Sequence, residues 1–235
     1  MASALGDRPV VFEINTLPWL TSVALRRGRT FTLADIPPEA WDDVLPPGID
    51  AVWLMGVWQR SPAGIEIARH NPDLQRSFRE ALPDYTDADL VGSPYCVRDY
   101  QVDPALGGEP GLAKARADLA DRGLRLVLDY VPNHVAPDHP WVTGHPEHFI
   151  RGTAEDAAAD PAAWLVVGDP AQDDAVHGGQ VLARGKDPYF APWPDVVQLN
   201  AFDPRLRAAT IETLSGIADR CDAVRCDMAM LLMND

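Results

Sequence analysis

The chain has 235 residues, of which 46% are hydrophobic and 23% charged, a composition typical of a soluble globular protein. Its formal net charge of −15 argues against nucleic acid or an anionic membrane as a partner, and favours a neutral substrate held by hydrogen bonds and aromatic stacking. Seven tryptophans suit sugar rings, although most tryptophans serve packing.

Two apolar runs in the first quarter of the chain predict buried strands. They cover residues 10–14 (VVFEI) and 50–57 (DAVWLMGV). Near-continuous apolar runs fit parallel strands that are covered on both faces. Between them, residues 33–45 predict a poor helix that prolines interrupt. Residues 65–100 are polar and irregular, with a short helix expected over 72–81.

The clearest helix covers residues 110–122. Pro110 stands at its start and Gly123 just past its end, which is the usual asymmetry of helix termini. A third strand over 124–128 (LRLVL) follows at once.

Residues 135–200 are rich in proline, glycine, aspartate and histidine, and they predict an irregular insertion with short strands at 163–167 and 180–183. A helix over 204–219, with Asp203 as its N-cap, follows. A fourth strand covers residues 222–226 (DAVRC), so strands alternate with helices around the insertion. This order predicts an α/β fold with a parallel sheet and right-handed crossovers.

Polar side chains gather where the third and fourth strands end, the edge at which α/β folds collect function. Arg225 and Asp227 are two residues apart on a strand, so both point to one face. A guanidinium beside a carboxylate lowers the carboxylate's pKa, and an ionised carboxylate there can act as the nucleophile of a glycosyl transfer. Spacing alone favours a structural ion pair between Arg225 and Asp227 over a catalytic role.

Three further residues could bind a polar ligand. Asn133 and His134 follow the third strand and could form hydrogen bonds, and Tyr95 could stack on a sugar face. Each of them, taken alone, is more often a turn or loop residue.

Four segments, in order and spanning nearly the whole chain, resemble conserved stretches of the α-amylase family, glycoside hydrolase family 13. Residues 129–134 (DYVPNH) resemble its first conserved region and residues 223–227 (AVRCD) its second. Two more segments match the second strand and the stretch after it: Trp53-Leu54, and Tyr95 to Tyr100 with Val102-Asp103-Pro104 and Gly107-Gly108.

The resemblance implies a (β/α)₈ barrel of TIM type, of which the first four strands are present. Residues 1–134 and 201–235 would form the N-terminal half of the catalytic barrel, and residues 135–200 the irregular domain B. The implied function is a retaining glycoside hydrolase or transglycosylase acting on α-glucosidic bonds of a glucan or oligosaccharide.

The resemblance also implies roles for single residues. Asp227 would be the nucleophile, and Arg225 would orient and ionise it. The substrate-binding residues would be His134 on the sugar hydroxyls, Tyr95 stacked under the ring, and the mainly architectural Asp129 and Asn133.

The metal expected from the family is not supported by the sequence. In many members the position of Asn133 also ligates calcium. Met230 and Leu231 stand where the family often has Lys-His, and in the family that histidine contributes a ligand to the calcium site and the pair a substrate contact. A separate departure is Gln198-Leu199-Asn200, where the domain B motif usually reads Asp-Leu-Asn. We therefore predict no metal and no cofactor, with calcium possible but unsupported.

The family's third and fourth conserved regions, which supply the acid/base glutamate, have no match. A barrel of this kind needs about 250 residues without large insertions. We therefore expect a fragment that is inactive alone and lacks the C-terminal half of the barrel or an oligomeric partner. Glu13 is a tempting acid/base, but the resemblance gives it only a structural role. The alternative is a non-catalytic carbohydrate-binding or assembly half-barrel that needs a partner chain.

Other features are expected to be unremarkable in function. Cys96, Cys221 and Cys226 are odd in number and match no zinc spacing, so we expect reduced thiols in a cytoplasmic protein. No signal peptide or transmembrane segment is expected. A cluster of polar residues without a known metal spacing is expected to lie on a loop-rich surface: His134, Asp138, His139, His145, Glu147 and His148.

Overall fold

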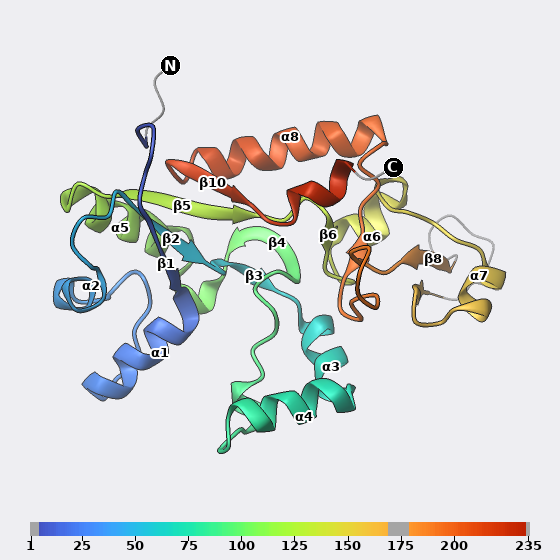
Figure 1. Cartoon of the computed structure of the whole chain (residues 1–235), viewed down its shortest axis with the longest axis horizontal. Helices are drawn as coiled ribbons and strands as arrows, with labels where there is room; N and C mark the ends of the chain where they lie inside the picture. The colour runs from blue at the N-terminus through green and yellow to red at the C-terminus, as the bar shows by residue number, and fades with distance from the viewer. Residues whose placement is uncertain (1–4, 169–178, 234–235) are drawn as a thin grey trace. The chain divides into compact units, whose positions relative to one another are not determined.

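The computed structural model describes residues 5–168 and 179–233, which divide into two compact units (Figure 1). The first, here called the sheet unit, comprises Met1–Gln59, Tyr100–Tyr130 and Ile211–Asp227. The second, here called the loop-rich unit, comprises Arg60–Asp99, Val131–Thr210 and Met228–Asp235.

A four-stranded parallel sheet forms the centre of the sheet unit (Figure 1). Its strands, in spatial order, are β1 (Val11–Asn15), β2 (Ala51–Met55), β5 (Arg125–Tyr130) and β10 (Ala223–Cys226). The four predicted strands and the parallel α/β class are therefore confirmed. Among the described residues, β1 and β10 each pair on one side only. The closed barrel stays a prediction.

The strand β5 is longer than expected. It was predicted to end at Leu128, but it continues to Tyr130 because β10 pairs with it as far as Cys226. Side chains along a strand alternate between faces. Leu126 and Leu128 are fully buried on one face, and Asp129 therefore points to the other. The extra pairing places Asp129 inside the strand rather than in the loop after it.

The helices of the sheet unit include α1 (Thr16–Arg27), α2 (Pro38–Val44) and α5 (Gly108–Asp121). The helix α5 packs against β5 and confirms the predicted helix at 110–122. The helix predicted over 33–45 is wrong in its first part, because Pro38 holds the residue before it in an extended conformation.

Helix α1 was not predicted. Its first turn contains Pro18, which masks the helical spacing of its buried residues Trp19, Leu20 and Val23. The helix ends at Gly28, whose φ of 71° is a conformation that glycine adopts at little cost.

The loop-rich unit holds short elements around a small apolar core. Its helices are α3 (Pro62–His70), α4 (Pro72–Ala81), α6 (Pro140–Gly144) and α7 (Ala154–Ala159). Of these, only α4 was predicted. The unit also contains two antiparallel strand pairs. The strand β6 (His134–Val135) pairs with β9 (Val197–Gln198), and β7 (Trp164–Val167) pairs with β8 (Gln180–Ala183). The second pair confirms the two predicted short strands. The core consists of Val135, Val142, Phe149, Leu182, Val197, Leu199 and Leu206.

Three elements contain residues of both units: β3 (Trp58–Arg60), β4 (Val97–Val102) and α8 (Pro204–Ala218). Helix α8 confirms the helix predicted at 204–219. The Arg205 N–H donates to Oδ1 of Asp203 at 2.8 Å, as expected of an N-cap. The 3₁₀ turns are Asp87–Asp89, Pro104–Leu106, Pro146–His148 and Ala229–Met233.

No helix in the described ranges combines the length and apolar composition needed to cross a membrane.

Candidate active site

Three charged side chains meet at the carboxyl ends of β5 and β10 in the sheet unit. Arg225 is the register partner of Asp129, so both point to the same face, and Asp227 follows two residues later. Nη1 of Arg225 lies 2.5 Å from Oδ1 of Asp227 and 3.6 Å from Oδ1 of Asp129. One guanidinium therefore lies beside two carboxyl groups.

The two carboxyl groups are buried, whereas the Arg225 side chain is 35% exposed. Asp129 is 2% exposed and Asp227 is 7% exposed. The N–H of Asp227 donates to the carbonyl of Tyr130 at 2.8 Å, which prolongs the β5–β10 ladder past the strand end. The guanidinium carbon of Arg225 lies 4.7 Å from the ring centre of Trp53. Charges act strongly on each other in such a place, because little water screens them.

Asp129 is the carboxyl whose protonation the site alters most clearly. Burial raises the pKa of Asp129 to about 6, and the charge of Asp227 adds to this. The Gly56 N–H, 3.2 Å from Oδ2, and the nearby Arg225 oppose the increase. Asp129 is therefore poised to change charge just below neutral pH.

In the loop-rich unit, a second group brings together the predicted residues Tyr95, Asn133 and His134. His134 is 5% exposed, and burial lowers the pKa of His134 to about 4 although a hydrogen bond to the backbone of Tyr95 opposes this. Nδ1 of His134 lies 3.1 Å from Nδ2 of Asn133. The imidazole is therefore neutral at pH 7, with one donor and one acceptor nitrogen. Tyr95 is half-buried.

Sequence reasoning did not assign functional roles to two neighbours of these groups. Trp53 lies beside Arg225, a contact that depends on strand register. Gln198 donates to both oxygens of Asn133. The sequence did single out the position of Gln198, because the family usually has an aspartate there.

The histidine cluster differs in part from its predicted surface position. His134, His139 and His148 are buried, so a surface location is wrong for these three. Ligand atoms of His145, Glu147 and His148 lie within 4.8 Å of one another.

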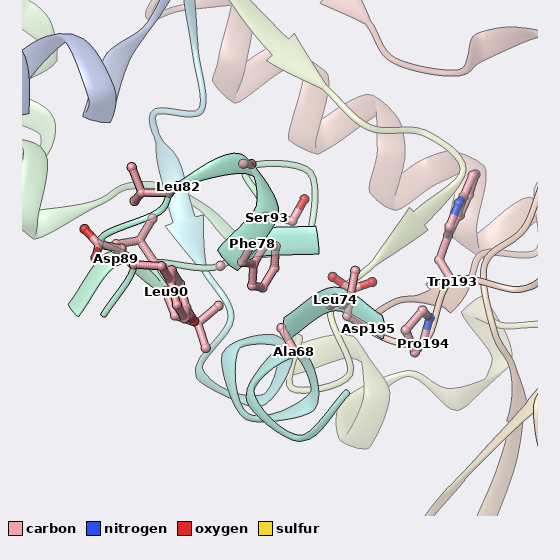
Figure 2. A pocket seen from close by; sticks show the side chains of 14 residues that line it. Ala68, Leu74, Phe78, Leu82, Asp89, Leu90, Ser93, Trp193, Pro194 and Asp195 are labelled. Atoms are coloured by element: carbon pink, nitrogen blue, oxygen red, sulfur yellow. The ribbon is translucent and has the colours of Figure 1, made fainter. Parts of the chain in front are cut away.

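A cavity of about 470 Å³ lies in the loop-rich unit between α3, α4 and residues 193–195 (Figure 2). Its lining is mainly apolar and includes Leu74, Phe78 and Trp193. Polar side chains such as Asp89, Ser93 and Asp195 are a minority of this lining, so the cavity fits a sugar poorly, because sugar hydroxyls need several polar partners.

Comparison with known proteins finds relatives that match part of the chain in sequence. No family model matches it. It is 38% identical over 143 residues to an amino acid transporter heavy chain of Mus musculus, covering 52% of this chain and 19% of the relative. It is 32% identical over 133 residues to an alpha-1,4-glucan:maltose-1-phosphate maltosyltransferase of Rhodospirillum rubrum, covering 54% and 17%.

Two solved structures share the fold over almost the whole chain. An α-amylase from Lactobacillus plantarum superposes with a TM-score of 0.54 at 19% identity, covering 94% of this chain and 38% of that one. An inactive double mutant of MutB in complex with isomaltulose gives a TM-score of 0.59 at 19% identity, covering 93% and 34%.

The fold is therefore that of α-amylase-type enzymes, as far as its four strands extend. Together with the sequence matches, this confirms the resemblance to the α-amylase family, glycoside hydrolase family 13, that the motifs indicated. The chain spans about a fifth of the length of the two curated relatives and somewhat over a third of the two solved structures.

Proposed function

We propose that this chain carries the nucleophile of a retaining glycoside hydrolase or transglycosylase acting on α-glucosidic bonds. The observation that carries the proposal is the contact of 2.5 Å between Arg225 and Asp227 at the carboxyl end of β10, with Asp227 almost buried. A carboxylate held by a guanidinium in a poorly solvated place is what a covalent glycosyl transfer requires.

In the proposed reaction, a carboxylate oxygen of Asp227 attacks the anomeric carbon of the sugar. The bond from that carbon to the leaving oxygen breaks, and a glycosyl ester on Asp227 forms. An acid/base protonates the leaving oxygen and then activates water or an acceptor sugar hydroxyl, which releases the ester. Arg225 keeps the attacking carboxylate in place. His134 and Tyr95 are proposed to bind the sugar.

We propose that the acid/base comes from outside these 235 residues. A retaining enzyme needs its two carboxyls about 5–5.5 Å apart. Glu13 is exposed on the outer strand β1, and its role is proposed to be structural. The described sheet has four strands, whereas a closed barrel has eight. Further strands, and with them the second carboxyl, would come from additional chain or from a partner. The domain B boundaries at residues 135 and 200 are part of this proposal.

Asp227→Asn in the complete protein tests the assignment. The substitution keeps the size of the side chain but removes the nucleophilic charge, so we expect kcat on an α-glucan to fall at least about a thousandfold. Asp121→Asn, the same change at an exposed position in α5, is the control and should leave kcat unchanged. Undiminished activity of the Asp227 variant would rule the nucleophile out.

A second function is favoured by one observation, the likeness to a protein named an amino acid transporter heavy chain. In this alternative the chain is a non-catalytic carbohydrate-binding or assembly half-barrel that works with a partner chain. Size-exclusion chromatography and glucan-binding assays distinguish this alternative from the proposed enzyme. A well-folded monomer that binds glucan, and whose complete protein hydrolyses or transfers none, would support the alternative and exclude the enzyme.

A further inference from the structure

The amide of Gln198 lies in a cage of three oxygens inside the loop-rich unit. Its Nε2 is 2.8 Å from the backbone oxygen of Asn133, 2.9 Å from Oδ1 of Asn133 and 3.3 Å from the backbone oxygen of Leu199. Backbone carbonyls can only accept hydrogen bonds, so the Gln198 atom that faces them must be the nitrogen. The side-chain atom of Asn133 that faces the same nitrogen must then be its oxygen.

The orientation of the Asn133 amide in turn determines which nitrogen of the His134 ring carries the proton. With Oδ1 of Asn133 turned to Gln198, its Nδ2 faces Nδ1 of His134 at 3.1 Å. Because an amide nitrogen only donates, Nδ1 of His134 accepts, and the proton of the neutral ring resides on Nε2. Gln198, through Asn133, therefore favours the same tautomer of His134 as the hydrogen bond of this ring to the Tyr95 backbone does.

The same cage is where the family resemblance leads one to expect calcium, and its residues do not fit that ion. Calcium takes six to eight oxygen ligands, usually including carboxylates. Here residue 198 presents N–H groups, which repel a cation, and both oxygens of Asn133 already accept from them. Leu231, where the family often has a histidine, adds an apolar side chain to the cavity that Asn133 and Gln198 also line.

We infer that Gln198 replaces a calcium ion in this chain. Its amide nitrogen donates to oxygen atoms of Asn133 and Leu199, links the short strands β6 and β9, and orients Asn133 and His134 without metal. The strands pair directly at this point, with His134 opposite Gln198 and the Leu199 N–H donating to the carbonyl of Asn133 at 3.0 Å. This inference does not depend on the proposed enzymatic activity.

Thermal unfolding of the chain with calcium chloride or with EDTA tests the inference. The unfolding temperature of the wild type should be the same in both. Gln198→Glu replaces the N–H donors by carboxylate oxygens that face three further oxygens. We expect its unfolding temperature to fall by about 4–8 °C in EDTA and to return toward the wild-type value with calcium.

Gln75→Glu is the matched control. Nε2 of Gln75 donates to one backbone carbonyl, that of Ala68 at 3.1 Å, and to the hydroxyl of Tyr85 at 3.4 Å. It offers no oxygen cage, so calcium should not restore any stability that this variant loses. An increase of the wild-type unfolding temperature with calcium would overturn the inference. So would a Gln198→Glu variant whose unfolding does not respond to calcium.

The tautomer of His134 provides a measurement that needs no variant. Nitrogen NMR of the wild-type chain, with the His134 ring assigned, distinguishes a protonated Nε2 from a protonated Nδ1. A proton on Nε2 supports the role of Gln198 even where the Glu variant fails to fold. A proton on Nδ1 would contradict the hydrogen-bond sequence from Gln198 to His134.

Discussion

Arg225 contacts two carboxyl groups that differ in their distance from the guanidinium and in their burial. Asp227 has the closer contact, at 2.5 Å, while Asp129 lies 3.6 Å away and is the more deeply buried. Burial, which this longer contact only partly offsets, raises the pKa of Asp129 to about 6.

Asp129 makes stability depend on pH. Its pKa increases from 3.8 to about 6 on folding, so the folded state binds this proton more tightly than the unfolded state does. The resulting stabilisation is complete below about pH 4 and is lost as pH rises through 6, a change of about 3 kcal/mol. Asp129→Asn should remove this dependence and be the more stable protein at pH 7.

Urea unfolding of both proteins between pH 4 and 7 measures this difference, with Asp121→Asn as a control for the loss of one negative charge. We expect the difference in unfolding free energy between Asp129→Asn and wild type to grow in favour of the variant as pH rises. A difference that stays constant across this range would contradict the raised pKa.

At the level of single residues, the contacts that could be predicted from the sequence are those that depend only on spacing along one strand. Arg225 and Asp227 share a face because they are two residues apart, and the structure has them in contact. The contact of Arg225 with Asp129 depends on the register between two strands that are almost a hundred residues apart, which no local pattern reveals. The bond from Gln198 to Asn133 likewise depends on a strand pairing within the insertion.

The start of β10 is fixed to β5 and α5 by Asp222. Oδ2 of Asp222 accepts from the Leu126 N–H at 2.9 Å, and Oδ1 accepts from Arg116 at 2.8 Å. Arg116 also donates to the carbonyls of Asp219 and Cys221. These bonds hold the strand that carries Arg225 and Asp227.

Asp222→Ala should therefore destabilise the fold. It leaves the Leu126 N–H and the Arg116 guanidinium without this acceptor, and we expect a loss of about 2–3 kcal/mol in unfolding free energy. Asp222→Asn retains an acceptor oxygen and should lose less. Chemical unfolding measures both values, and equal losses in the two variants would show that the hydrogen bonds do not account for the effect.

Among the elements, strands were easier to predict than helices. Short, mainly apolar segments marked the four strands of the parallel sheet. The inner strands β2 and β5 are largely buried, as expected of parallel strands covered on both faces, whereas the outer strands β1 and β10 are partly exposed. Helices α6 and α7 of the insertion were missed, and so were α1 and α3. Both α1 and α3 have proline in the first turn, at Pro18 and Pro62, which helices tolerate there but which resembles a turn in the sequence.

For the whole molecule, the described sheet has four parallel strands, and its outer strands pair on one side only. The chain spans 38% of the α-amylase with which it superposes. We expect these 235 residues alone to show no turnover of α-glucans, and activity to appear when the remaining barrel strands are supplied on the same chain or on a partner. Full activity of a species with an intact mass of 25.7 kDa would contradict this.

Covalent labelling tests the central claim, that Asp227 is the nucleophile, most directly. A fluorinated α-glucosyl fluoride has a good leaving group, and its fluorine slows hydrolysis of the glycosyl-enzyme, so the ester accumulates on the residue that attacks. After incubation with the complete protein, proteolysis and peptide mass spectrometry locate the added sugar. We expect the sugar to be on Asp227 and the Asp227→Asn variant to remain unlabelled. A sugar on any other residue would contradict it.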